Sequence, residues 1–153
     1  MPFKATYRRF SVFASYLQDV VLLLARLTVA YGFYEPAMNK WSDIDGIAGW
    51  FATLGIPWPA LNAYLAASTE LLGVALLSLG LLTRLISLPL MIVMVVAITT
   101  VHLGNGFAAG NNGFEIPLYY LLFLAIFLTH GPGKFSLDYL LFERKASVTG
   151  RPD

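Results

Sequence analysis

Four long apolar runs constrain the fold of this chain more than any other feature of its sequence. They cover approximately residues 17–38, 60–82, 85–103 and 114–130. A helix needs about 17–25 apolar residues to cross a bilayer. Only 12% of the residues are charged, against about a quarter in soluble domains, because a surface that faces lipid needs no charge. We predict an all-α fold, a four-helix transmembrane bundle that forms a single membrane domain over residues 1–153.

The segments outside these runs indicate one interfacial helix and a second interfacial segment. The loop after the first run contains all the tryptophans of the chain, Trp41, Trp50 and Trp58, and this residue favours the membrane–water interface. Isoleucine and phenylalanine recur at helical spacing over residues 43–54, which predicts a short amphipathic interfacial helix in the first outer loop. Residues 131–153 are predicted to form a cytoplasmic tail that contains a second interfacial segment, 135–142.

The positive residues predict the orientation. Eight of the ten lysines and arginines lie on one side of the predicted bundle: Lys4, Arg8, Arg9, Arg84, Lys134, Arg144, Lys145 and Arg151. The opposite side has only Lys40, and Arg26 lies inside the first run. Because cytoplasmic loops carry the excess of lysine and arginine, we expect both termini in the cytoplasm.

Two charges fall within the predicted spans. A charged side chain near the bilayer centre costs about 2.5–3.5 kcal/mol on insertion scales, so Arg26 and Glu70 need partners. Glu70 shares a helix face with Ala66 and Gly73, and such small residues favour close helix packing. Long side chains could bring Arg26 and Glu70 together, and we predict an ion pair. That pair could be a structural contact, or it could be a proton relay or ligand site.

A second polar group gathers at the outer helix ends, where it could surround one outward-facing pocket. Its members are Glu35, Met38, Lys40, His102, Asn112 and Glu115. The candidate catalytic residues are Glu70, Arg26, His102 and Glu115, and the candidate cofactor-binding residues are Arg26, Lys40, Glu70 and Asn112. His102, Met38 and Glu35 are weak metal-ligand candidates. Copper binding is disfavoured because this side has one histidine and methionines at helical spacing are usually core residues.

Several classes of chemistry are not expected. The chain has no cysteine, which removes iron–sulfur ligation and disulfides. His102 and His130 lie at opposite ends of the bundle, too far apart to ligate one haem. A net charge of +1 without a polybasic block gives no reason to expect nucleic acid.

A set of short motifs, in order and spacing, resembles the DoxX family of small four-helix bacterial membrane proteins. The motifs are Arg26-Leu27 with Lys40, residues 69–73 (TELLG), 80–84 (GLLTR), 101–103 (VHL), 112–118 (NGFEIPL) and 131–133 (GPG) with 136–138 (SLD). Many members carry His-Gly where this chain has Pro36-Ala37, so a histidine-dependent site at that position does not carry over. Glu35-Pro36-Ala37 instead resembles a branch found with gene clusters for modified, metal-binding peptides.

The resemblance implies a redox-linked role in the bacterial cytoplasmic membrane. The chain would be a quinone-interacting membrane subunit, or a partner of a soluble oxidoreductase, without an evident electron carrier of its own. The alternative is a non-enzymatic membrane accessory or anchor protein for a metal-related modified-peptide or stress-response system. A small transporter is a third interpretation. Besides the lipid bilayer, the expected partner is another protein or further copies of this chain. Whether the chain is an enzyme at all stays open.

Overall fold

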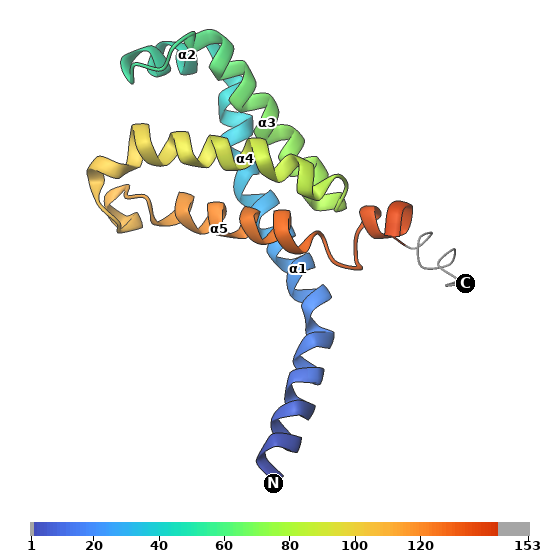
Figure 1. The fold of residues 1–153 in the computed structure, drawn as a ribbon. Helices are drawn as coiled ribbons and strands as arrows, with labels where there is room; N and C mark the ends of the chain where they lie inside the picture. The colour runs from blue at the N-terminus through green and yellow to red at the C-terminus, as the bar shows by residue number, and fades with distance from the viewer. Residues whose placement is uncertain (1, 144–153) are drawn as a thin grey trace.

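The computed structural model describes residues 2–143, and every regular element in that range is helical (Figure 1). Residue 1 and residues 144–153 lie outside the described range, and so do the predictions made for Arg144, Lys145, Arg151 and the end of the tail. The long helices are α1 (Pro2–Ser42), α2 (Ile44–Thr53), α3 (Pro59–Leu79), α4 (Thr83–Ala97) and α5 (Glu115–His130). The short ones are η1 (Ile98–His102), η2 (Leu103–Asn105), η3 (Ala109–Asn111) and η4 (Tyr139–Glu143). The all-α prediction is confirmed.

Among the described residues, three helical stretches are long and apolar enough to cross a membrane: Thr6–Ser42, Pro59–Leu79 and Thr83–Asn105, the last formed by α4 with η1 and η2. A fourth, α5, is equally apolar but shorter, at 16 residues. The predicted short helix of the first loop is α2. Asp43 caps it by accepting a hydrogen bond from the Gly46 amide at 3.0 Å, and α2 packs on α3.

The first helix begins at Pro2, well before the apolar run that the sequence shows. Proline is favoured in the first turn of a helix, and no glycine occurs before Gly32, so nothing interrupts the helix where its polarity changes. At 1.5 Å per residue the 41 residues of α1 extend for about 60 Å, roughly twice the hydrocarbon thickness of a bilayer. Figure 1 shows that the N-terminal part of α1 extends beyond the other helices.

The core lies where α1, α3, α4 and α5 meet. Its buried apolar residues include Leu22, Val29, Phe33, Leu77, Leu90, Met94, Leu124 and Phe127. Glycines allow the close approaches: a Cβ on Gly73 of α3 would lie 2.8 Å from a methyl group of Leu90 in α4, and a Cβ on Gly32 would overlap the hydroxyl of Tyr120. Small residues at helix interfaces are typical of membrane bundles, where backbones pack closely.

Candidate functional site

A buried ion pair joins α1 to α3. The Lys40 Nζ lies 2.9 Å from Glu70 Oε2, and the Glu70 side chain is 3% exposed while that of Lys40 is 16% exposed. The prediction that Glu70 faces the bundle is therefore confirmed. The predicted Arg26–Glu70 pair is wrong, since the partner of Glu70 is Lys40.

Small side chains let the lysine reach inward. Ala37 lies one turn before Lys40 in α1, Ala63 and Ala67 lie on the Glu70 face of α3, and all three are fully buried. The two helices can approach closely along these alanines, which leaves a path for the lysine stem from the end of α1 toward the middle of α3. The length of the Lys40 side chain thus bridges the distance from the end of α1 to Glu70.

Arg26 has a structural role at the other end of α3. It is fully buried, and its guanidinium donates to the carbonyl oxygen of Leu77 at 2.9 Å and to that of Phe135 at 2.5 Å. The C-terminal end of a helix carries partial negative charge, so the end of α3 helps to compensate the guanidinium. Gly80 is required beside it: its φ is +64°, and a Cβ there would overlap Arg26 Nη1. Arg26 therefore fastens α1 to α3 and to the segment after α5.

The segment 131–138, which we call the C-terminal clasp, folds back on the α3–α4 turn. The Asp138 carboxylate accepts hydrogen bonds from the backbone amides of Leu82 at 2.7 Å and Thr83 at 2.9 Å, and the Asp138 amide donates to Gly80 O at 3.0 Å. The amide of Lys134 donates to Asp19 of α1 at 2.9 Å. Sequence reasoning missed the roles of Asp19 and Asp138, although the Ser-Leu-Asp motif after Gly-Pro-Gly was visible.

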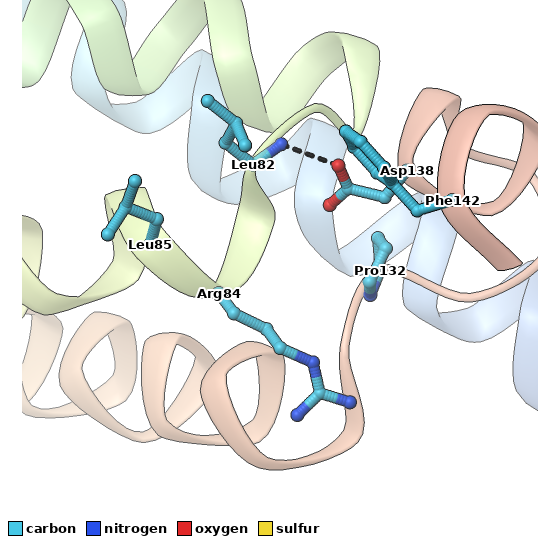
Figure 2. A pocket seen from close by; sticks show the side chains of 6 residues that line it. All are labelled: Leu82, Arg84, Leu85, Pro132, Asp138 and Phe142. Carbon is cyan, nitrogen blue, oxygen red and sulfur yellow. Dashed lines mark hydrogen bonds between the residues drawn. The ribbon is translucent and has the colours of Figure 1, made fainter.

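A shallow pocket of about 250 Å³ lies beside the clasp, and it is lined by Leu82, Arg84, Leu85, Pro132, Asp138 and Phe142 (Figure 2). Its two charged groups already have partners. Asp138 caps α4, as the dashed line to the Leu82 amide shows, and Arg84 donates to the carbonyl oxygens of Leu128 and Thr129 at the end of α5. The polar atoms of this pocket thus hold the helix ends together.

The polar residues predicted to surround one outer pocket do not all come together in the structure. His102 Nδ1 lies 2.8 Å from the carbonyl oxygen of Asn112, and Glu115 accepts hydrogen bonds from the Ala109 amide at 2.9 Å and the Tyr119 hydroxyl at 3.0 Å. These contacts fix the loop between α4 and α5.

The α1 members of that group lie apart from this loop. Lys40 turns instead to Glu70, and within residues 2–143 no hydrogen bond or ion pair joins Glu35 or Met38 to His102 or Glu115. Among the described residues, no three His, Asp or Glu side chains gather closely enough to hold a metal ion together.

Comparison with known proteins agrees with the membrane assignment. The family model for DoxX matches residues 21–103, more than half of the chain. The chain is 35% identical to an uncharacterized protein of Haemophilus influenzae over 80% of this chain and 83% of that protein. It is 30% identical to the putative oxidoreductase CatD of Bacillus subtilis over 83% of this chain and 91% of that protein. It is 32% identical to the inner membrane protein YphA of Escherichia coli over 79% of this chain and 90% of that protein.

No solved structure matches the chain. The family match covers Arg26, Lys40, Glu70, Gly80 and Arg84, which include both partners of the buried ion pair. The helical fold, the apolar spans and these relatives lead to one assignment. The chain is a membrane protein of the DoxX family.

Proposed function

We propose that this protein is a quinone-interacting membrane subunit that works with a soluble oxidoreductase. It would lie in the bacterial cytoplasmic membrane with both termini in the cytoplasm. The observation that carries the proposal is the Lys40–Glu70 pair, buried between two apolar helices. Ionisable residues inside a membrane bundle are costly, and they mark proton or substrate paths. The relative CatD, described as a putative oxidoreductase, supports redox chemistry.

The pair suits the proton part of quinone chemistry. Reduction of a quinone to a quinol takes up two electrons and two protons at the two carbonyl oxygens. The Lys40 ammonium is a hydrogen-bond donor that can polarise one carbonyl oxygen, and the Glu70 carboxylate can hold and pass a proton. Electrons come from the partner oxidoreductase, so this chain contributes binding, orientation and proton transfer.

A planar ring would have access to Lys40, the partly exposed member of the pair. Trp41, next to Lys40 in α1, packs edge-on against Tyr64 of α3, with ring centroids 6.0 Å apart, and both rings are exposed. Lys40 is itself partly exposed. Aromatic side chains and one or two polar groups are the usual lining of a site for a small apolar molecule. We therefore place the quinone head group against Trp41 and Lys40.

Binding is tested with the purified protein in lipid nanodiscs and a short-chain ubiquinone or menaquinone analogue. A ligand that binds only the folded state raises the unfolding temperature as its concentration rises. We expect that rise in the wild type and in Asp19→Asn, a control that weakens the exposed Asp19–Lys134 pair. Glu70→Gln and Lys40→Gln should abolish it. The proposal fails if no quinone shifts the wild type, or if Glu70→Gln responds as the wild type does.

The accessory-protein alternative is favoured by two separate exposed apolar regions. Leu140, Leu141 and Phe142 are exposed after the clasp, and Trp50 is exposed on α2. Photocrosslinkers attached to single cysteines near Trp50 and Tyr139 can separate the two functions, because the chain has no cysteine of its own. Capture of one defined protein by a chain that does not respond to quinone would favour the accessory role. Adducts with lipid alone would count against it.

A further inference from the structure

The first third of α1 lies outside the bundle, and we call residues 4–17 the N-terminal arm. Every residue from 6 to 18 is exposed, and from residue 6 onward Leu22 is the first buried residue of the helix. In Figure 1 the arm is the dark blue end of α1, with no other helix beside it. The arm carries large apolar side chains, among them Phe10 and Phe13, each more than 60% exposed. Apolar surface of this size needs a covering partner.

Several side chains of the arm lie on two opposite faces of the helix. Lys4, Arg8, Ser11 and Ser15 recur at intervals of four, three and four residues, so they share one helix face. Phe10, Phe13 and Leu17, at intervals of three and four, share the opposite face. A basic polar face opposite an aromatic and aliphatic face is the pattern of a helix that lies in the membrane interface.

The positive charge of the arm indicates an anionic partner. Lys4, Arg8 and Arg9 give the first 18 residues three positive charges, and the first acidic residue of the chain is Asp19. Two arms packed in parallel would bring these charges together without a carboxylate to compensate them. An anionic lipid surface offers the complementary charge, and each lysine or arginine near it strengthens binding.

The direction of α1 and its attachment agree with this partner. Figure 1 shows α1 crossing α4 and α5 obliquely. Since α4 with η1 and η2 is long and apolar enough to cross a membrane, a helix that runs across it leaves the bundle sideways. The base of the arm is tied there: Asp19 accepts from the Lys134 amide at 2.9 Å and pairs with Lys134 Nζ at 3.5 Å. The neighbouring Phe135 is exposed, so an apolar side chain also lies at this level.

We propose that the N-terminal arm is a docking helix for an anionic lipid surface. Its aromatic face enters the acyl boundary, and its basic face contacts phosphate-bearing head groups. The arm thereby fixes the tilt of α1, on which Lys40 also lies. This inference is independent of the proposed redox function, since it rests on residues 4–19 and not on the ion pair.

The test uses full-length protein, whose lack of cysteine allows single nitroxide labels. Phe13→Cys labels the apolar face, and Ser11→Cys, two residues away on the polar face, is the matched control. Both are reconstituted in phosphatidylcholine vesicles with and without phosphatidylglycerol. Collisions with oxygen report a lipid environment, and collisions with a water-soluble nickel chelate report water. In anionic vesicles we expect the label at 13 to favour oxygen and the label at 11 to favour nickel.

Removing the charge or the anionic lipid should weaken this contrast. The label at 13 should shift toward nickel in Arg8→Gln/Arg9→Gln, in high salt, and in phosphatidylcholine alone. These variants remove no core contact, because residues 6–18 are all exposed. The proposal is overturned if both labels favour nickel in anionic vesicles. It is also overturned if the accessibility of the label at 13 seen in anionic vesicles is the same in the Arg8→Gln/Arg9→Gln variant, in high salt and in phosphatidylcholine alone. Spin–spin coupling between arms of different copies would also overturn it, in favour of a second copy.

Discussion

The Lys40–Glu70 pair is a buried ion pair between two helices, and its energetics depend on both members being present. Removing one partner leaves a buried charge without compensation, which destabilises proteins by about 3–5 kcal/mol, whereas replacing both by apolar groups is often neutral. The pair is nearly closed to solvent on the Glu70 side. Its two members should therefore behave as a unit.

Single and double replacements test that coupling. Lys40→Met should lower the free energy of unfolding by about 3–5 kcal/mol, and Lys40→Met/Glu70→Leu should recover most of the loss. Reversible unfolding in mixed micelles measures both. If the double variant is less stable than either single one, the two side chains are not coupled and the ion pair does not describe their interaction.

Gly80 offers a second test of a single residue. Its left-handed backbone and its contact with Arg26 leave no room for a Cβ. Backbone strain of this kind costs on the order of 1–3 kcal/mol, so Gly80→Ala should destabilise the protein by at least that amount. Gly104→Ala is the matched control, since open space surrounds that residue. Equal stability of the two variants would show that Arg26 does not depend on Gly80.

The sequence predicts a residue's position well when that position depends on its neighbours in the same helix. That Glu70 faces the bundle follows from Gly73 and the other small residues on its face, and helical periodicity makes such a face visible in sequence. The partner of Glu70 was mispredicted. Helical periodicity shows which residues share a face, but it does not show how far a long lysine side chain reaches along the helix axis. Arg26 was misassigned for a related reason: its partners are the backbone carbonyls of Leu77 and Phe135, which every residue carries and no motif marks.

Among the elements, the clasp has the least expected role. Residues 131–138 follow a helix-stop signal, yet they return to the bundle and supply the N-terminal cap of α4 through Asp138. Side-chain caps stabilise a helix by about 0.5–2 kcal/mol. A loop that caps a distant helix also fixes the angle between α3 and α4.

Hydrogen exchange can show this role. Asp138→Ala should speed exchange of the Leu82 and Thr83 amides, because both lose their acceptor. Asp43→Ala, which removes the cap of α2, should instead speed exchange near Gly46 and leave the α3–α4 turn protected. Unchanged protection of the turn in Asp138→Ala would contradict the assignment of a capping clasp.

For the whole molecule, the all-helical fold and the places of its apolar helices followed from four apolar runs, because length and polarity decide whether a helix can cross a membrane. The extent of α1 did not follow, since the start of its apolar run was taken for the start of the helix. Helix continuity depends on the absence of breakers, and none occurs between Pro2 and Gly32. The apolar run fixes only which part of a helix lies in lipid.

The orientation predicted from the positive residues has a direct test in intact cells. Single cysteines at Gly110 in the α4–α5 loop and at Ser11 in the arm can be treated with a membrane-impermeant maleimide. We expect labelling of Gly110→Cys from outside, and labelling of Ser11→Cys only after the membrane is broken. The reverse pattern would place the termini outside.

The proposed function depends on whether Glu70 exchanges a proton when a quinone is reduced. Infrared difference spectra of the reconstituted protein, recorded as a bound quinone is reduced electrochemically, observe the carboxyl group itself. We predict a protonated-carboxyl band that shifts with carbon-13 glutamate, disappears in Glu70→Gln and persists in Asp19→Asn. A spectrum that is identical in wild type and Glu70→Gln would contradict a proton-handling role for the Lys40–Glu70 pair.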